Sequence, residues 1–206
     1  MTSKEHWEKI YTTRAVAEVS WFQKHAALSL KLITQSAISK SASVIDVGGG
    51  ASTLVDDMLA KGYSHLTVLD LSPTALASAR SRLGARADEV QWIEAGILEA
   101  DLPVHGYDLW HDRAVFHFLT VEAERRAYVD QVLRSVKPGG FVIVATFSED
   151  GPNRCSGLPT MRYSASELHA ELGESFELLD HERETHHTPG GNEQRFVYCF
   201  FRKTGS

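Results

Sequence analysis

The apolar and polar positions of the chain follow two periods, which predict helices and strands in alternation. Residues 21–38 repeat apolar side chains at helical spacing. Residues 43–47 form a short apolar run that ends in glycines, as a buried strand does. A second helical stretch, residues 52–61, stops at Gly62, and residues 65–70 follow as a strand with an acidic end.

Helix-start chemistry predicts three further helices. Ser72-Pro73 opens one that Gly84 closes, because the serine side chain can cap free amides and a proline at the first helical position loses no hydrogen bond. Thr120 is expected to cap a helix that runs through Val136. Residues 164–167, Ser-Ala-Ser-Glu, have the spacing of a capping box.

Between these helices, short apolar runs predict further strands. Residues 90–94 and 107–111 form the third and fourth. Residues 137–140, Lys-Pro-Gly-Gly, are expected to turn the chain. Residues 141–147 are almost continuously apolar, which is typical of a central strand covered by helices on both faces.

The C-terminal part departs from this alternation. Residues 176–183 and 196–202 are strand-like with only a polar, glycine-rich stretch between them, so they predict a hairpin whose last strand is antiparallel. In the rest of the chain, strands alternate with helices, which requires right-handed crossover connections between parallel strands. The predicted fold is α/β: a doubly wound, mostly parallel sheet with helices on both faces and ligands beyond the carboxyl ends of the strands.

Length and composition favour one domain in a single compartment. The 206 residues, 43% of them apolar, are expected to form one domain over 1–206, with 1–40 as an N-terminal helical lid and 41–206 as the ligand-binding core. A net charge of −6 without a basic block argues against a nucleic-acid partner.

The sequence shows neither a membrane span nor a signal peptide, so a cytoplasmic protein without a membrane partner is expected. Cys155 and Cys199 are expected to be reduced, and the ten histidines form no metal-binding motif.

A glycine turn and an acidic strand end indicate a nucleotide-like ligand. Asp46 lies two residues before Gly48-Gly49-Gly50, which links the first strand to a helix. Asp70 lies 20 residues after Gly50 at the next strand end, where a carboxylate can accept both ribose hydroxyls. The alternative is a tight turn with Asp70 capping the next helix.

The same turn distinguishes two ligands. In a dinucleotide fingerprint, a glycine or alanine would replace Thr53. Asp46 would repel a pyrophosphate, whereas it suits a ligand that carries an ammonium and a sulfonium. The turn therefore favours S-adenosylmethionine (SAM) over NAD.

Three motifs, at residues 44–50, 68–72 and 136–140, resemble those of the class I, seven-stranded SAM-dependent methyltransferases. The similarity spans residues 40–202. It implies a sheet in the order 3-2-1-4-5-7-6 with strand 7 antiparallel. It also implies SAM as cofactor and S-adenosylhomocysteine (SAH) as product.

The resemblance further implies which residues contact the cofactor. Asp46 and the three glycines would line the methionine part of SAM, and Asp70 with the adjoining Leu71 its ribose. The family often has an acid after strand 3 that binds the adenine amino group, but Gly96 stands there. Either Glu94 or a backbone carbonyl replaces it, or adenine binding is weaker, and the Ile97 backbone amide is expected to meet the ring.

Two closer resemblances point to different acceptors. Residues 107–114 look like the segment after strand 4 in thiopurine-type methyltransferases, which act on thiols and related chalcogen compounds. Trp7, Tyr11, Trp21-Phe22 and residues 190–192 look like the elongation-factor lysine methyltransferases. The N-terminal aromatic residues are expected either to form a lid over SAM, with Tyr11 against the cofactor, or to pack on the sheet.

The candidate catalytic residues follow the fourth strand. His111 is placed to remove a proton from an amine or alcohol, or else packs over the methionine part of SAM without proton transfer. Asp112 and Arg113 either orient that histidine or hold the SAM carboxylate; alternatively they are helix-start charges. His117 faces the pocket or is a core residue. The loop 150–159 is expected to shape the acceptor pocket, with Cys155 contacting a soft substrate or merely inert.

The sequence thus predicts a SAM-dependent methyltransferase that acts on a small-molecule acceptor, a thiol, metalloid, amine or hydroxyl. Its short length, acidic charge and lack of an appended recognition domain favour this function. A protein-lysine N-methyltransferase is the alternative. A SAM-binding protein without catalysis and an NAD-dependent oxidoreductase are the remaining hypotheses.

Overall fold

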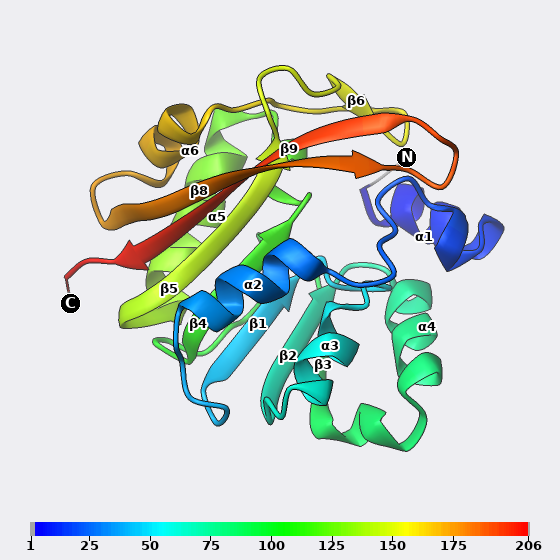
Figure 1. Cartoon of the computed structure of the whole chain (residues 1–206), viewed down its shortest axis with the longest axis horizontal. Helices are drawn as coiled ribbons and strands as arrows, with labels where there is room; N and C mark the ends of the chain where they lie inside the picture. Colours follow the sequence, from blue (N-terminus) through cyan, green and yellow to red (C-terminus); the bar gives the residue numbers. More distant parts are fainter. Residues whose placement is uncertain (1–2, 206) are drawn as a thin grey trace.

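The computed structural model describes residues 3–205, in which a central sheet is flanked by helices (Figure 1). The helices are α1 (Ser3–Thr13), α2 (Ala27–Gln35), α3 (Leu54–Ala60), α4 (Pro73–Leu83), α5 (Glu122–Ser135) and α6 (Ala165–Leu172). Short 3₁₀ turns are η1 (Val16–Glu18), η2 (Gly84–Glu89) and η3 (Phe116–Phe118). The sheet strands are β1 (Ser43–Val47), β2 (His65–Asp70), β3 (Val90–Glu94), β4 (Tyr107–Arg113), β5 (Val136–Phe147), β8 (Phe176–His187) and β9 (Glu193–Lys203).

The sheet has the strand order β3-β2-β1-β4-β5-β9-β8. Strands β1 to β5 pair in parallel, whereas β9 runs antiparallel to both β5 and β8. With β8 and β9 as the sixth and seventh strands, this is the predicted order 3-2-1-4-5-7-6, and the predicted fold class is confirmed. The order reverses between β1 and β4, where a doubly wound sheet opens a crevice for ligands.

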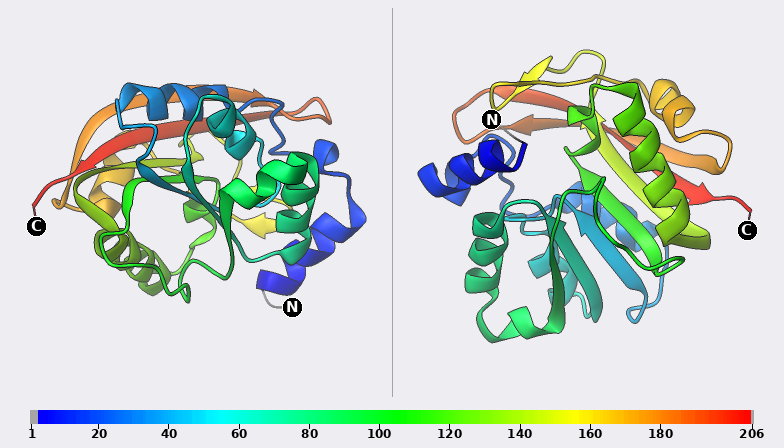
Figure 2. Two further views of the ribbon diagram at one scale, coloured as in Figure 1. Left: turned by 90° about the horizontal axis from the view of Figure 1, so that it is seen from below. Right: turned by 180° about the vertical axis from the view of Figure 1, so that it is seen from behind.

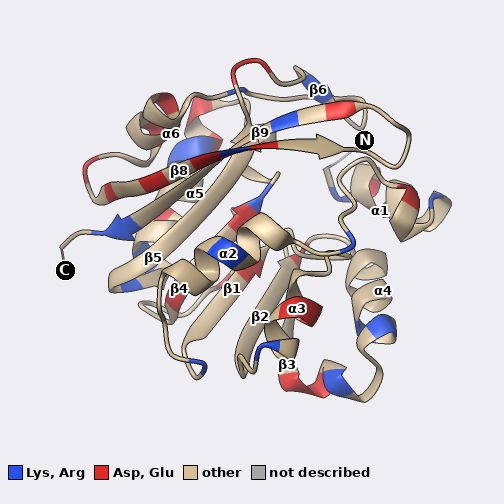
Figure 3. Ribbon diagram, in the orientation of Figure 1, with Lys and Arg blue, Asp and Glu red and all other residues tan. Residues whose placement is uncertain are grey.

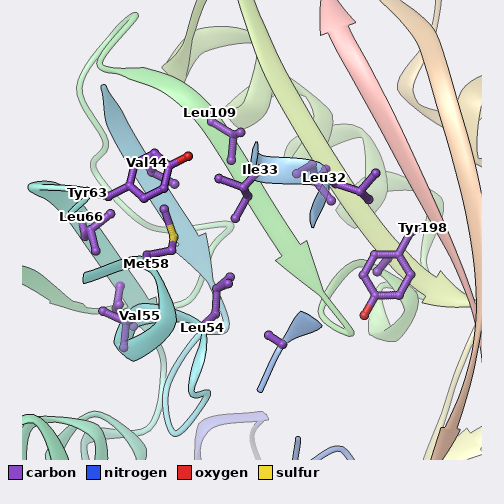
Figure 4. Close-up of a cluster of buried hydrophobic side chains, with 14 of the residues drawn as sticks. Leu32, Ile33, Val44, Leu54, Val55, Met58, Tyr63, Leu66, Leu109 and Tyr198 are labelled. Carbon is purple, nitrogen blue, oxygen red and sulfur yellow. The ribbon is translucent and has the colours of Figure 1, made fainter. Parts of the chain in front are cut away.

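Helices cover both faces of the sheet. Figure 1 shows α2 and α3 on the near face, and the rear view in Figure 2 shows α5 along the other. On the near face, side chains of α2 and α3 gather with apolar residues of β1, β2 and β4 (Figure 4). A second cluster joins α5 and α6 to the opposite face. The central strand β5 therefore carries two buried faces along residues 142–147, as its apolar run predicts.

Charged side chains on the edge strand β8 oppose its pairing with a strand of another chain. Acidic residues recur along it in Figure 3. Two of them contact α2, since Lys31 Nζ lies 2.7 Å from Glu182 and Gln35 donates to Asp180 at 3.2 Å. Charged side chains on an edge strand oppose pairing with another chain.

Several predicted helix signals are confirmed. The Ser72 side chain accepts from the Ala75 amide at the start of α4, and Gly84 ends that helix with φ +59°. Ser164 and Glu167 form the capping box of α6. Local hydrogen bonds decide these ends, so short motifs predict them.

Two helix starts were predicted wrongly. The helix expected from residue 21 begins at Ala27, because long-range contacts hold the preceding segment: the Thr53 hydroxyl donates to Gln23 O at 3.0 Å, and the Ala26 amide donates to Asp57 at 3.2 Å. Thr120 does not cap α5. Val121 occupies the N-cap position without a side-chain hydrogen bond, and the helix starts at Glu122.

Other differences lie at strand ends. Residues 137–140 form a bulge within β5 rather than a turn, because Tyr107 pairs with Val136 and Leu109 with Phe141. Strands β4, β8 and β9 are longer than predicted. The loop expected at 150–159 contains a hairpin of β6 (Arg154–Cys155) and β7 (Leu158–Pro159), whose turn has φ +50° at Ser156 and +83° at Gly157.

Within residues 3–205, no helix is long and apolar enough to cross a membrane. Cys155 and Cys199 are both buried and free.

Candidate functional site

A cavity of about 910 Å³ opens at the carboxyl ends of the parallel strands. It is lined by the glycine turn after β1, the ends of β2 and β5, the segment after β3, and parts of α1 and β9. A smaller cavity of about 40 Å³ shares Tyr11, Trp21, Gly48 and Arg113 with it, so the two adjoin. This location is the crevice at the point where the strand order reverses.

The glycine turn brings the backbone close to two carboxylates. The amides of Gly48 and Gly49 both donate to Leu69 O, at 2.7 and 3.2 Å. A Cβ on Gly49 would lie 2.6 Å from Asp46 Cγ, and one on Gly50 would lie 2.8 Å from Asp70 Cγ. Gly48 has φ +67°, and a Cβ there would collide with Val115. The turn needs glycines because Asp46 and Asp70 pack directly against it.

Asp46 is held by a buried histidine. Asp46 and His111 are paired residues of β1 and β4, and Asp46 Oδ1 lies 2.7 Å from His111 Nδ1. Because a carboxylate accepts, Nδ1 donates, which leaves Nε2 of a neutral ring to accept from Ser29 Oγ at 2.8 Å. The Ser29 side chain comes from α2 and is fully buried. Asp46 Oδ2 has no hydrogen-bond partner among the described residues.

Asp70 ends β2 beside the cavity. Its Oδ1 accepts from the Ser72 amide at 2.8 Å. Burial raises the pKa of this carboxyl to about 6, although hydrogen bonds from backbone amides oppose the shift. Asp46 and Asp70 thus place two buried carboxylates at adjoining strand ends on either side of the glycine turn.

The segment after β3 supplies an acid that the sequence did not point to. Gly96, Ile97 and Glu99 all line the large cavity. The Glu99 carboxylate folds back over Gly96, where an added Cβ would collide with its Oε2. Glu94, expected to replace the missing acid, lies outside the cavity and pairs with Lys4 at 2.7 Å. Glu99 was missed because no motif marks a position three residues beyond the expected one.

Comparison with known proteins identifies this arrangement. Residues 45–142 match a protein family described as a methyltransferase domain. The protein is a class I, SAM-dependent methyltransferase. SAM is the cofactor of this enzyme, and the matched residues contain the glycine turn, Asp70, β4 and the end of β1.

The methyltransferase is similar to proteins of different acceptor classes. It is 23% identical to EEF1A lysine methyltransferase 2 of Homo sapiens over 86% of this chain and 75% of that protein. A structure from a study of disulfide-to-thioacetal conversion in echinomycin biosynthesis superposes with a TM-score of 0.80 at 19% identity, covering 98% and 93% of the chains. The 1,6-didemethyltoxoflavin-N1-methyltransferase of Burkholderia thailandensis gives 0.71 at 21% identity, covering 98% and 84%.

The N-terminal helix α1 of the methyltransferase lies over the cavity. Lys4 anchors it to Glu94 at the end of β3, and Glu8 accepts from Ser72 Oγ at 2.6 Å and from the Thr74 hydroxyl at the start of α4. Burial acts to raise the pKa of Glu8, but these hydrogen bonds outweigh it and lower that pKa. Figure 2 shows α1 beside α4.

Aromatic side chains line the part of the cavity beyond β5 and β9. Trp7 of α1 contacts Trp21 and Phe118 with ring centroids 5.4 and 5.0 Å apart. Phe147 and Phe196 contact each other at 4.9 Å on the sheet side. Tyr11 contacts Trp21 at 5.9 Å, and Phe22 lines the small cavity. Cys155, Leu158 and Pro159 of the 154–159 hairpin also line the large cavity.

The predicted cofactor residues fall into three groups. Tyr11, Gly48, Asp70, Leu71, Gly96 and Ile97 line the large cavity. Asp46, Gly49 and His111 line the small one. Gly50 lies behind both, against Asp70 and Ala75. The structure therefore brings all of them to one crevice.

The three candidate catalytic residues point to two faces of the sheet. Side chains alternate along a strand, so His111 and Arg113 face α2 whereas Asp112 faces α5. Asp112 is fully buried, accepts from the Val115 and Phe116 amides and the Tyr128 hydroxyl, and lines neither cavity. Burial raises its pKa to about 6. This geometry fits a structural charge that organises the start of η3.

Arg113 lines both cavities and is already paired. Its Nε donates to the Tyr198 hydroxyl at 2.7 Å, and its guanidinium lies 4.5 Å from the Phe196 ring centroid. Glu184 lies 3.5 Å from Nη2. Arg113 therefore contributes a positive charge near the aromatic part of the cavity, with a carboxylate close behind it.

His117 is a core residue. The Phe147 amide donates to its Nδ1 at 3.3 Å, and burial, with the Arg113 charge, lowers its pKa to about 3. The ring is fully buried and lines neither cavity. Over residues 3–205, no group of three His, Cys, Asp or Glu side chains is arranged to hold a metal ion.

Three further residues near the cavities went unnoticed in the sequence. Ser29 holds His111, while His6 and Gln194 line the large cavity with a buried Nε2 and Oε1 that have no hydrogen-bond partner among the described residues. None belongs to a motif, so no sequence signal marks them.

Proposed function

We propose that this methyltransferase transfers the methyl group of SAM to a small-molecule acceptor held beneath α1. The observation that carries the proposal is the cover over the cavity. Helix α1 is anchored at Glu94 and at the start of α4, and its Trp7 contacts Trp21 and Phe118, which line the same cavity. A covered, aromatic cavity suits a small molecule that enters whole.

The polar atoms near the glycine turn fit the cofactor. Asp46 Oδ2 is a buried carboxylate oxygen without a protein partner, so an ammonium group of the ligand would satisfy it. Asp70, next to Leu71, is suited to accept ribose hydroxyls, and Glu99 with the Ile97 backbone to bind the adenine edge. SAM supplies a methyl group on a positively charged sulfur, which leaves alignment as the main task of the protein.

The proposed roles of the remaining residues follow from their contacts. His111 acts as a positioning residue: both ring nitrogens are engaged, so it orients Asp46 instead of removing a proton. Tyr11 and residues 1–40 act as a lid over the core, residues 41–206. Arg113 borders the acceptor, and Asp112 supports the backbone after β4.

A protein-lysine acceptor is the second candidate. The similarity to EEF1A lysine methyltransferase 2 extends over 86% of the chain, which favours it. Opening of α1 would be required for a protein segment to reach the same cavity.

Calorimetric titration with SAM, SAH and NAD tests the cofactor assignment. The two adenosyl ligands are expected to bind and NAD is not. Asp70→Ala should weaken SAH binding by about 1 to 3 kcal/mol through lost hydrogen bonds, whereas Asp88→Ala, an exposed control, should not. Binding of NAD alone would overturn the assignment, and unchanged SAH affinity in Asp70→Ala would remove Asp70 from the ribose site.

Transfer from radiolabelled SAM in a cell extract separates the acceptor classes. Label in the small-molecule fraction supports the proposal, and label on protein lysine supports the second candidate. Tight SAH binding without turnover on either fraction would favour a binding protein without catalysis.

A further inference from the structure

The acceptor end of the cavity has one aromatic wall that is partly exposed. We call this end the acceptor compartment and define it by Trp7, Trp21, Phe118, Phe147, Gln194 and Phe196. Trp7 contacts both Trp21 and Phe118 on the side of α1, and these three rings are partly exposed, whereas Phe147 and Phe196 contact each other as buried rings of the sheet beneath them. Aromatic rings bind flat apolar groups through stacked and edge-on contacts. The compartment is therefore suited to a flat ring system.

The charges around the compartment disfavour a cationic ligand. Arg113 borders it with a permanent positive charge. The carboxylates that line the same cavity are Asp70, Glu99 and Glu124, which lie at the end of β2, after β3 and at the start of α5. Burial raises the pKa of the Cys155 thiol, so this neighbour is uncharged at neutral pH. Glu184 lies 3.5 Å from Arg113 but does not line the cavity, so an ammonium in the compartment would meet the Arg113 charge and no carboxylate among the six defining residues.

Gln194 adds one polar group to these aromatic side chains. Its side chain is 8% exposed, lines the cavity, and leaves Oε1 without a hydrogen-bond partner in the described part of the chain. A primary amide presents a donor and an acceptor side by side. The same amide reads the edge of a purine by pairing with an adjacent acceptor and donor. Leaving the buried Oε1 without a hydrogen bond costs free energy. A ligand that donates a hydrogen bond to this atom would recover that free energy.

We propose that the acceptor is an uncharged, flat nitrogen heterocycle whose edge, with adjacent donor and acceptor atoms, pairs with the amide of Gln194 beside the aromatic wall of Trp7, Trp21 and Phe118. This inference rests on the proposed function. Transfer forms one bond from a nucleophilic ring heteroatom to the methyl carbon and breaks the methyl–sulfur bond, whose electron pair stays on sulfur. A proton carried by that heteroatom leaves to water, so the buried rings of His111 and His117 need take no part.

The protein saturated with SAH provides the test. The probe is 2-quinolone, a flat bicycle with adjacent N–H and carbonyl groups, and the matched probe is 1-methyl-2-quinolone, which lacks the N–H. Nα-acetyl-lysine amide represents the lysine alternative. Calorimetry gives the affinities. Tryptophan fluorescence locates the site, because Trp7 and Trp21 line the cavity whereas Trp92 and Trp110 do not.

We expect 2-quinolone to bind about tenfold more tightly than its methylated form, as loss of one buried hydrogen-bonded pair predicts. In Gln194→Met the two quinolones should bind alike, while SAH affinity stays unchanged. Gln194→Glu, which keeps the size of the side chain, should bind 2-quinolone more weakly than the wild type. The exposed control Gln35→Met should retain the tenfold preference.

Two results would overturn the inference while leaving the proposed function intact. One is SAH binding without 2-quinolone binding or with no change of preference in either Gln194 variant. The other is tighter binding of the lysine amide than of 2-quinolone, which would support the protein-lysine candidate. Failure of SAH itself to bind would instead remove the proposed function.

Discussion

The two ends of the cavity are built differently. At the ends of β1 and β2 the site consists of a glycine turn and two buried carboxylates, Asp46 and Asp70, fixed by hydrogen bonds to neighbouring groups. Beyond β5 and β9 it consists of aromatic side chains from α1, η3, β5 and β9 that contact one another. The first end is set by backbone geometry and charge, and the second by packing between distant segments.

This difference separates binding of a fixed ligand from recognition of a variable one. Strand ends and a glycine turn have little freedom to change, because an added Cβ meets Asp46 or Asp70. The rings of Trp7, Trp21 and Phe118 lie outside the sheet and are partly exposed, so they can be substituted without altering it. Changes at the carboxylate end should therefore affect stability and SAH binding together, whereas changes at the aromatic end should mainly affect the acceptor.

The largest expected effect comes from removing the histidine behind Asp46. His111→Ala leaves a buried carboxylate and the Ser29 hydroxyl without their partner. We expect the free energy of unfolding to fall by about 3 kcal/mol, measured by urea denaturation, and SAH binding to weaken with it. The exposed control His65→Ala should change stability little. Equal stabilities of the two variants would mean that the hydrogen bonds of His111 to Asp46 and Ser29 do not stabilise the fold.

Residues 40–94 could be predicted well because local signals decide their structure. A glycine run after a short strand and an acid at the next strand end required no knowledge of distant contacts, and β1, β2 and β3 have the predicted bounds. Of the alternatives for Asp112, the one in which it orients His111 was avoidable, because neighbouring residues of a strand face opposite ways.

The rest of the site depends on contacts between distant residues. Ser29 meets His111 across 82 positions, and the start of α2 is set by Thr53 and Asp57 rather than by its own sequence. Trp7, Phe118 and Phe196 meet at one cavity from elements far apart in the chain. Glu99 belongs to no sequence motif. Short patterns of neighbouring residues do not predict contacts between distant residues.

A second prediction concerns pH. Burial raises the pKa of Asp70 to about 6, above the model-peptide value of 3.8. The folded state therefore keeps a proton that the unfolded chain loses, and the stability this contributes is lost as the pH rises from about 4 through 6. Relative to Asp70→Asn, the wild type should lose about 2 to 3 kcal/mol of unfolding free energy over that range.

Urea denaturation of both proteins at several pH values measures this difference. Other titrating groups, including Asp112 and His117, are present in both proteins and cancel to first order. If the unfolding free energies of the two proteins changed with pH in parallel, ionisation of Asp70 would not destabilise the folded state. Added SAH should stabilise the wild type more above pH 6 than below it, because the ionised carboxylate accepts the ribose hydrogens.

A third, smaller effect is expected from the glycine turn. In Gly50→Ala the new Cβ would lie 2.7 Å from Ala75 Cβ and against the Asp70 carboxylate. Overpacking of this kind should cost about 1 to 3 kcal/mol of stability and lower SAH affinity, both measurable by thermal denaturation with and without SAH. Gly190→Ala is the control, since its Cβ would meet nothing closer than Thr188 Oγ1 at 3.9 Å. If Gly50→Ala binds SAH with the affinity of the wild type, the glycine turn tolerates substitution, and the carboxylate end is not more constrained than the aromatic end.

The smallest expected effect tests the connection between the two ends. Glu8 ties α1 to Ser72 and Thr74 beside the carboxylate end, while Trp7 on the same helix forms part of the aromatic wall. Glu8→Gln should weaken this anchor by about 1 kcal/mol, so the amides of α1 should exchange hydrogen roughly fivefold faster while those of β1 do not. Glu18→Gln, exposed and outside α1, is the control. Unchanged exchange in α1 would mean that the aromatic contacts of Trp7 hold the helix alone, and that closure over the acceptor is independent of the carboxylate end.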